Sequence, residues 1–365
     1  MKKFFLSILS CICFTSICWA QNPVIIGYVG GYRGLINVNV SSKKLSIINY
    51  AFVDIKDNRA WLHREATDTI NFGRLNELKK QNPALKVVIS IGGWTWSGKF
   101  SDAVLTDTSR AAFAASAVDI VRKYGLDGVD IDWEYPGRPG LEGNVYRPED
   151  KQNFTLMFHD LRHALDSIKQ QTGKNYLLTT AVGGFASFLD NTEMGKAQQY
   201  LNYITLMTYD FSDVVATHHT NLYNTNLYQT QKYADNAVNA FIAAGVPADK
   251  LVMGLAFYGR VYNLVSDTKR GIGDTILNRD KGKGYSTIKD SLVNQNGYVR
   301  YHDRKAKASY LYNAAKRQFI TYDDEWSVKK KCRYVLSKKM GGVMFWEYSS
   351  DPKEYLLDEV NTILR

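Results

Sequence analysis

The chain has 365 residues, of which 45% are hydrophobic and 22% charged, and its formal net charge is +10 at pH 7. This composition is typical of a globular protein, and its scattered lysines argue against a nucleic-acid-binding protein. The one dense basic cluster, Lys329–Arg333, is predicted to be the solvated face of a helix. Aromatic residues are abundant, with 24 Tyr, 16 Phe and 7 Trp, and aromatic ring faces suit sugars.

The first residues have the pattern of an export signal. Two lysines precede an apolar run from Phe4 to Trp19, which is followed by a small residue, Ala20. This pattern predicts a secretory signal peptide over residues 1–20, cleaved before Gln21, and hence a secreted or periplasmic protein. The run is too short for a spanning helix and later apolar segments are interrupted by polar residues, so no membrane span is expected.

Cysteine usage predicts a mature protein without an intramolecular disulfide. Cys332 is the one cysteine outside the signal segment, because the other three are Cys11, Cys13 and Cys18. Cys11 faintly resembles a lipoprotein processing site, but that site would leave an unusually short signal. Cys332 is predicted to be a packed thiol rather than a nucleophile. Stability must come from a large core, which residues 21–365 can supply, and we expect a monomer.

Apolar runs and amphipathic segments alternate along the mature chain. Eight runs are candidate strands: Val24–Tyr28, Ile47–Phe52, Val87–Gly92, Val129–Glu134, Leu177–Val182, Ile204–Tyr209, Leu251–Phe257 and Gly342–Trp346. Helical spacing follows between most of them, as in Ala111–Tyr124, Asp150–Thr172, Thr230–Ala244 and Ser327–Lys339. This alternation predicts an α/β fold, a (β/α)8 TIM barrel over residues 21–365, with its chemistry at the carboxyl ends of the strands.

The connection between the seventh and eighth strands is too long for a simple barrel loop. Residues 261–321 contain strand-like runs at Tyr298–His302 and Ala308–Asn313, and we predict a small α+β insertion there. The barrel is expected to fold without residues 263–316, because the cut lies between strand ends.

Four acids lie within the eight residues from Asp127 to Glu134. Since side chains alternate along a strand, Asp130, Asp132 and Glu134 are predicted to share one face, opposite Val129, Ile131 and Trp133. Carboxyls crowded on a buried face raise one another's pKa values, so that one of them can act as a general acid near neutral pH. The alternative is a half-exposed strand with a solvated acidic face, which would not need so apolar an opposite face.

Metal and cofactor chemistry are poorly supported. His159 and His163 have helical ligand spacing but lie beside the apolar stripe of their helix, with no third ligand nearby, and His218 and His219 are no better candidates. The pattern of a serine-hydrolase nucleophile elbow is absent from the sequence. We therefore expect neither a metal nor a cofactor.

Five motifs, in order, resemble those of the glycoside hydrolase family 18 chitinases, and the resemblance covers nearly all of the mature chain. Asp127–Glu134 is similar to the DxxDxDxE signature, and Ser90–Gly93 to the SxGG motif. The other three are Met207–Asp210, Phe257–Arg260 and Gly342–Trp346. The long connection before Tyr322 resembles the chitinase insertion domain, although it is short.

The resemblance implies a substrate-assisted mechanism. Glu134 would be the general acid and then the base, Asp132 would orient the substrate's 2-acetamido group, Tyr209 would donate to its carbonyl oxygen, and Asp130 would share a proton with Asp132. Ser90 and Tyr28 would hold Asp130. The remaining substrate-binding candidates are Phe52, Trp94, Met207, Asp210, Tyr258, Arg260 and Trp346. Trp94 and Trp96 fit either sugar-stacking platforms or core packing.

The resemblance implies chitin, or an oligosaccharide containing N-acetylglucosamine, as the ligand. An endo-β-N-acetylglucosaminidase acting on N-glycan cores is an alternative with the same catalytic residues, and a chitin-binding lectin is a third, although lectins of this type usually lack the acid at Glu134. The run Ser212–Val214 departs from the family's usual turn, which puts substrate choice in doubt. Endo or exo action stays open.

Overall fold

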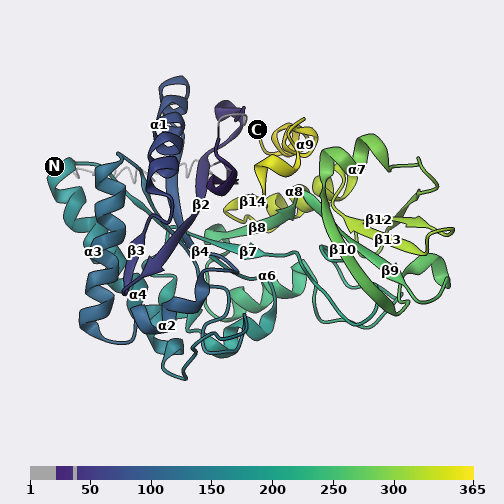
Figure 1. Cartoon of the computed structure of the whole chain (residues 1–365), viewed down its shortest axis with the longest axis horizontal. Coiled ribbons are helices and arrows are strands. Elements are labelled where there is room, and N and C mark those ends of the chain that lie inside the picture. The colour runs from purple at the N-terminus through teal and green to yellow at the C-terminus, as the bar shows by residue number, and fades with distance from the viewer. Residues whose placement is uncertain (1–21, 36–38) are drawn as a thin grey trace, which may run out of the picture.

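Eight parallel strands close into a barrel in the computed structural model, which describes residues 22–35 and 39–365 (Figure 1). β1 pairs with both β2 and β14, and this pairing closes the ring. The barrel strands are β1 (Val24–Gly30), β2 (Ile47–Lys56), β4 (Lys86–Gly92), β5 (Gly128–Asp132), β6 (Leu177–Gly183), β7 (Tyr203–Met207), β8 (Leu251–Ala256) and β14 (Gly342–Trp346). The predicted TIM barrel is confirmed. The predicted signal peptide, with Cys11, Cys13 and Cys18, lies outside the described residues.

Both faces of the barrel strands are buried, which explains why they are near-continuous apolar runs. Ile26 and Val88 belong to a small cluster inside the barrel, whereas Ile25 and Ile89 pack outward in the large cluster that includes the surrounding helices. A short strand, β3 (Arg59–Trp61), adds an antiparallel hairpin to β2.

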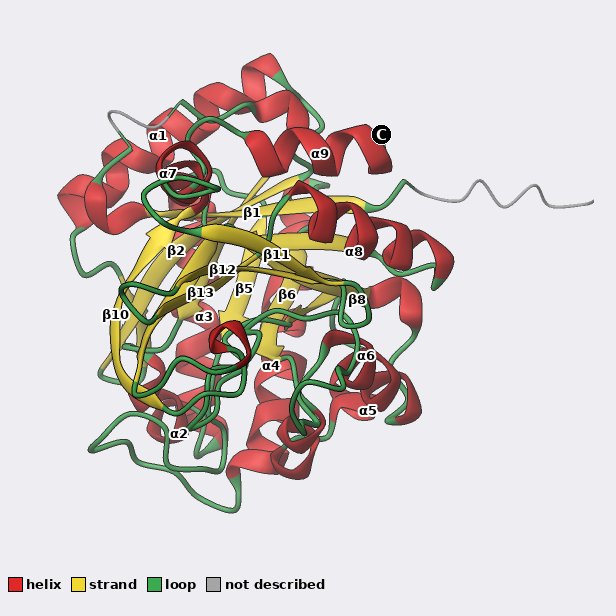
Figure 2. Ribbon diagram, turned by 90° about the vertical axis from the view of Figure 1, so that its right-hand side faces the viewer, coloured by secondary structure: helices red, strands yellow, loops and turns green. Residues whose placement is uncertain are grey.

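Helices cover the outside of the barrel, as Figure 2 shows. They are α1 (Glu65–Gln81), α2 (Phe100–Ala103), α3 (Asp107–Lys123), α4 (Asp150–Thr172), α5 (Met194–Ala197), α6 (Ala234–Ala243), α8 (Glu325–Ser337) and α9 (Tyr355–Leu364). α3 begins four residues before the predicted start, because Thr106 and Ser109 form a capping box there. α4 matches its predicted range, and its C-cap residue Gly173 adopts a left-handed conformation, with φ of 70°. None of the helices in the described ranges is both long and apolar enough to cross a bilayer.

The acidic strand ends earlier than predicted. β5 stops at Asp132, so Glu134 lies in the loop that follows, and β7 likewise stops before Tyr209. The ladder between β4 and β5 ends at the pair Gly92 and Asp132. Beyond it, the Asp132 carbonyl accepts hydrogen bonds from the Gly93 N–H at 2.8 Å and the Ser97 hydroxyl at 2.9 Å. These bonds fix the point at which the chain leaves β5 and enters the loop that carries Glu134.

A second sheet of five antiparallel strands lies between β8 and α8, and with α7 it forms a lobe on one side of the barrel (Figure 1). Its elements are β9 (Tyr258–Leu264), β10 (Ile276–Gly284), α7 (Tyr285–Ser291), β11 (Val299–Asp303), β12 (Ala308–Asn313) and β13 (Gln318–Tyr322). The predicted α+β insertion between the seventh and eighth barrel strands is thereby confirmed.

The lobe shares its hydrophobic core with the barrel. Tyr285, Ile288 and Leu311 are buried in the same cluster as Phe257 and Val328, which lie after β8 and on α8. Deleting residues 263–316 would strip three of these side chains from a common core. The expectation that the barrel folds without them therefore disagrees with the packing.

The basic cluster on α8 is not entirely a solvated face. Arg333 is exposed, but Lys331 is fully buried and its ammonium lies 2.7 Å from the buried Asp323 carboxylate. The prediction was wrong for Lys331, because a lysine can be buried when a carboxylate is buried with it. Cys332 is a buried free thiol, as predicted.

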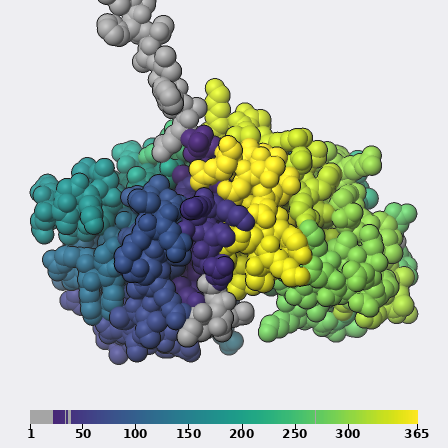
Figure 3. Space-filling view, turned by 90° about the horizontal axis from the view of Figure 1, so that it is seen from above, coloured from purple at the N-terminus to yellow at the C-terminus, as the bar shows by residue number. Residues whose placement is uncertain are grey.

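The two ends of the described chain lie close together. Figure 3 shows the earliest described residues, in purple, packed against the yellow C-terminal residues. Lys44 forms ion pairs with Glu354 and Asp358, which lie just before and on α9. The first and last barrel strands pair directly, and these ion pairs join the segments that follow each of them.

Candidate active site at the carboxyl end of the barrel

A cleft of about 1150 Å³ opens at the carboxyl ends of the barrel strands. Of the thirteen predicted site residues, eleven line it: Tyr28, Phe52, Trp94, Asp132, Glu134, Met207, Tyr209, Asp210, Tyr258, Arg260 and Trp346. Ser90 and Asp130 are fully buried and are not among its lining residues.

Asp130 is held by three hydroxyl groups. The Tyr28 and Ser90 hydroxyls donate to Oδ2 at 2.8 and 2.7 Å, and the Thr179 hydroxyl donates to Oδ1 at 2.6 Å. Burial raises the pKa of Asp130, and these hydrogen bonds oppose the rise. Sequence reasoning missed Thr179, although the register of the sheet places it directly beside Asp130.

Asp132 is buried and incompletely paired. No described residue donates a hydrogen bond to its Oδ1. Its pKa is raised well above the usual value, chiefly by burial and then by the charges of Glu134 and Asp130. A carboxyl in this state can hold a proton, or it can accept a donor group from a ligand in the cleft.

Glu134 carries the clearest sign of an acid catalyst. Burial and the nearby charge of Asp210 raise its pKa to about 7, while Arg138 opposes this rise. Its backbone N–H donates to the Ser97 hydroxyl at 3.1 Å, which fixes the loop. A carboxyl that keeps its proton near neutral pH can donate it to a leaving group.

Two glycines allow β4 to approach Asp132. Gly92 has φ of 112°, and a Cβ atom on it would lie 2.3 Å from the Asp132 carbonyl oxygen. Gly93 then donates its N–H to that same oxygen. Any larger residue at Gly92 would displace Asp132, which is a physical reason for glycine at this position.

Aromatic rings form the floor of the cleft. Trp346 stacks on Phe52 with ring centroids 5.4 Å apart and lies 5.7 Å from Tyr28. Trp94 is 53% exposed at the cleft, which fits a stacking platform rather than core packing. Trp96 is half-buried and packs against His63 at 5.5 Å.

Asp210 and Arg260 form a bidentate pair across the cleft wall. Arg260 donates from Nε to Asp210 Oδ1 at 2.7 Å and from a terminal nitrogen to Oδ2 at 2.5 Å. Burial alone would raise the pKa of Asp210, but contacts with His219 and Arg260 lower it well below its usual value. Asp210 has φ of 58°, a left-handed conformation that Asp tolerates better than most residues.

The chain matches the model of the glycosyl hydrolases family 18 over residues 24–351. It belongs to this family. Chitinase A1 of Niallia circulans is 42% identical over 311 residues, which are 80% of this chain and 44% of that protein. Chitotriosidase-1 of Mus musculus is 33% identical over 316 residues, which are 83% of this chain and 66% of that protein. The chain thus spans about half to two thirds of the length of these curated relatives.

Solved structures of family 18 proteins have the same fold. An N-acetylglucosaminidase from Paenibacillus barengoltzii aligns with a TM-score of 0.88 at 40% identity, covering 94% of this chain and 100% of that one. A chitinase from Bacillus thuringiensis also gives 0.88, at 34% identity, covering 94% of this chain and 70% of that one.

Several cleft residues of this family 18 protein had no signal in the sequence pattern. Arg138 donates to the Glu134 carbonyl at 2.9 Å and lies over the Phe185 ring at 5.0 Å. Arg279 and Asp280 reach the cleft from β10 of the lobe. The spacing of residues along the sequence could not reveal Arg138, Arg279 and Asp280 as cleft residues, because they come from a loop and from the second sheet.

The described residues contain no group of three or more His, Cys, Asp or Glu side chains arranged to hold a metal ion. The two adjacent histidines face different partners instead. His218 Nε2 lies 3.3 Å from Asp303, and His219 Nδ1 lies 3.5 Å from Asp210.

Proposed function

We propose that the protein is a retaining glycosidase that hydrolyses β-1,4 bonds between N-acetylglucosamine units of chitin or chito-oligosaccharides. The observation that carries the proposal is a pair of carboxyls that line the cleft: Glu134, with a pKa of about 7, and the buried and incompletely paired Asp132. Family membership and the chitinase relatives agree with this substrate class.

In this proposal the substrate supplies its own nucleophile. Glu134 gives its proton to the glycosidic oxygen while the 2-acetamido oxygen closes on the anomeric carbon to form an oxazolinium ion. Asp132 orients the acetamido group and stabilises the ring cation, with Tyr209 donating to the carbonyl oxygen. Glu134 then takes a proton from water, which opens the ring. Asp130 tunes Asp132 by sharing a proton with it.

Substrate binding in the proposal relies on rings and on the Asp210 and Arg260 pair. Trp346 is the floor of the sugar site before the cut, and Trp94 is a platform further along the cleft. The predicted signal peptide fits a substrate that lies outside the cytoplasm. The proposal therefore includes secretion or a periplasmic location, and no membrane span. We expect a monomer to suffice, since one chain contributes all these residues.

Anomeric configuration tests this mechanism. Chitotetraose hydrolysis, followed by proton NMR before mutarotation, should yield the β-anomer first. Oligomers deacetylated at the unit before the cut should resist cleavage, because a free amine cannot form the oxazolinium ring. An initial α-anomer would mean direct attack by water from the opposite face, and would overturn the roles of Asp132 and Tyr209.

Release of single N-acetylglucosamine units is the second candidate. It is favoured by the N-acetylglucosaminidase from Paenibacillus barengoltzii, whose whole chain aligns with this one. Mass spectrometry of the first products from chitohexaose separates the two: monosaccharide favours this candidate, and disaccharide or longer products favour a chitinase. Intact glycan released from a high-mannose glycoprotein, without cleavage of chitin oligomers, would instead indicate an endo-β-N-acetylglucosaminidase.

A further inference from the structure

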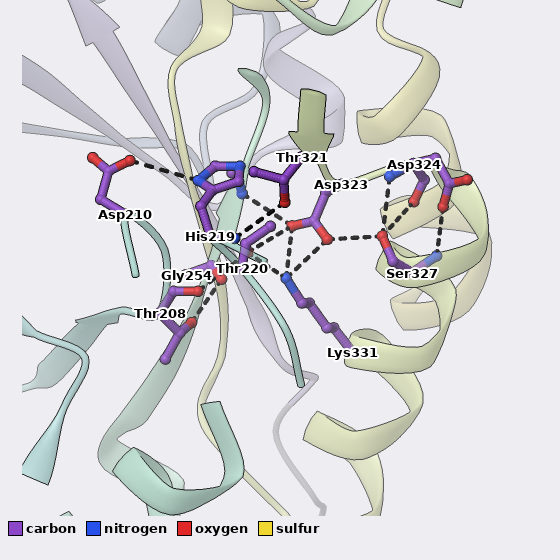
Figure 4. Close-up of polar contacts among 11 residues, drawn as sticks. Thr208, Asp210, His219, Thr220, Gly254, Thr321, Asp323, Asp324, Ser327 and Lys331 are labelled. Carbon is purple, nitrogen blue, oxygen red and sulfur yellow. Dashed lines mark hydrogen bonds and ion pairs between the residues drawn. The ribbon is translucent and has the colours of Figure 1, made fainter. Parts of the chain in front are cut away.

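A buried histidine lies directly behind Asp210. His219 is fully buried, and its Nδ1 is 3.5 Å from Asp210 Oδ1 (Figure 4). Its ring packs at 5.3 Å from the Tyr258 ring. Neither ring nitrogen meets hydrogen-bond geometry with a described residue, so the contact with Asp210 is an ion-pair-range approach of Nδ1. Asp210, a cleft residue, is the acidic side chain recorded within 4 Å of the imidazole nitrogens among the described residues.

His219 is fixed in place from both the barrel and the lobe. Its backbone N–H donates to the Thr321 hydroxyl on β13 at 3.1 Å, and its carbonyl accepts from the Phe211 N–H at 3.1 Å. The next residue, Thr220, donates to the Thr208 carbonyl at 3.1 Å and accepts from Lys331 at 2.6 Å. Figure 4 shows the contacts of His219 and Thr220 with Thr321, Thr208 and Lys331.

The buried pair of Lys331 and Asp323 completes this support. Asp323 Oδ2 accepts from the Ala256 N–H at the end of β8, at 3.2 Å, and from Lys331 at 2.7 Å. Apart from the bond to Phe211, the segment carrying His219 is therefore held by bonds to residues that do not line the cleft. Such a support can keep the imidazole in place while substrate enters.

The environment favours a neutral imidazole. Burial lowers the pKa of His219, and the nearby Asp210 opposes this. A neutral ring with its proton on Nδ1 would donate to the Asp210 carboxylate. The charged or titratable groups that face His219 are Asp210, Arg260, Asp323 and Tyr258.

Asp210 has a second side-chain partner besides His219, because Arg260 donates to both of its carboxylate oxygens. Asp210 and Arg260 expose 41% and 44% of their side chains, whereas His219 is fully buried, so His219 is the partner that the protein interior holds. After burial, the charge of Asp210 is the next cause that raises the pKa of Glu134. Groups that interact electrostatically with Glu134 are Asp210, Arg138, Asp132, Tyr135 and Tyr209.

We propose that His219 is a positioning residue that holds the Asp210 carboxylate toward Glu134 and so sets the upper pH limit of the reaction. The proposal rests on Glu134 being the acid. If His219 is lost, Asp210 moves away, the ionised form of Glu134 is repelled less, and Glu134 loses its proton at a lower pH. Activity that requires the protonated form then declines at a lower pH.

The test is the pH profile of kcat/KM on chitotetraose, whose sugar leaving group needs protonation. His219→Phe keeps a ring beside Tyr258 but removes the donor. The basic limb should move by about half a pH unit toward acid, which lowers kcat/KM about threefold at pH 8 and leaves it unchanged at pH 5. His219→Asn keeps a donor near the Nδ1 position. Its kcat/KM should therefore decline at nearly the same alkaline pH as that of the unchanged protein.

The matched control is His218→Phe. His218 is equally buried but pairs with Asp303, so this variant should lose comparable stability without moving the limb. In a background of Asp210→Asn, the His219→Phe change should cause no further shift, because its effect passes through Asp210. A uniform loss of rate with an unmoved limb, or an undiminished shift in that background, would overturn the proposal. Full turnover by Glu134→Gln would instead overturn the assignment of the acid, whatever His219 does.

Discussion

Asp130, Asp132 and Glu134 differ in the groups that surround them. Asp130 accepts three hydroxyl hydrogen bonds, whereas Asp132 Oδ1 has no donor among the described residues. Glu134 lines the cleft, where burial and then the charge of Asp210 raise its pKa and the charge of Arg138 lowers it. Side-chain alternation predicted that these three carboxyls share a face, but their separate environments depend on hydroxyls from other strands.

Glu134→Gln should nearly abolish hydrolysis of chitotetraose, with a loss of at least about 10² to 10⁴ in kcat, because the amide has no proton to give. Affinity measured by calorimetry should change little, since the amide is nearly isosteric. Glu142→Gln, an exposed carboxyl in the loop that follows, is the control and should retain activity. Loss of affinity together with rate would show that Glu134 is a structural group.

The helix α8 contributes both apolar side chains and a buried lysine to the protein interior. Its capping box between Asp324 and Ser327 fixes its start, and Val328, Cys332 and Val335 pack into the core. Lys331 lies among these buried positions and reaches Asp323, which in turn bonds the end of β8. The helix therefore ties the lobe to the barrel through a buried charge pair as well as through apolar contacts.

Lys331→Met should destabilise the protein by about 3 to 5 kcal/mol, because it leaves the Asp323 carboxylate buried without its cation. Urea unfolding would measure this. Arg333→Met, an exposed change on the same helix, should stay within about 0.5 kcal/mol. Combining Lys331→Met with Asp323→Asn should recover about 1 to 3 kcal/mol, and strict additivity would contradict the pairing.

Across the whole molecule, lobe and barrel behave as one packed body. Leu311 on β12 and Tyr285 on α7 belong to the same buried cluster as the helices that surround the barrel. The lobe also supplies Arg279 and Asp280 to the cleft. A single core of this kind predicts a single cooperative unfolding transition rather than two.

Leu311→Ala, in the lobe, should therefore lower the midpoint of one thermal transition for the entire protein, at a cost of about 2 to 5 kcal/mol. Leu311 is fully buried, whereas Leu277 on β10 is 66% exposed, so Leu277→Ala should have little effect. Scanning calorimetry would reveal the alternative, in which an early lobe transition separates from an unchanged barrel transition.

The sequence alone determined the barrel, the inserted lobe and the carboxyls, because each depends on a local pattern: buried runs of strand length, helical spacing, and acids at every second residue. Tertiary structure decided the rest. Asp210, Arg260 and His219 meet only because β7, β9 and the segment before α6 converge. Lys331 is buried only because Asp323 returns from the lobe beside it. Burial and pairing between distant segments set the pKa values, and no spacing along the chain encodes those distances.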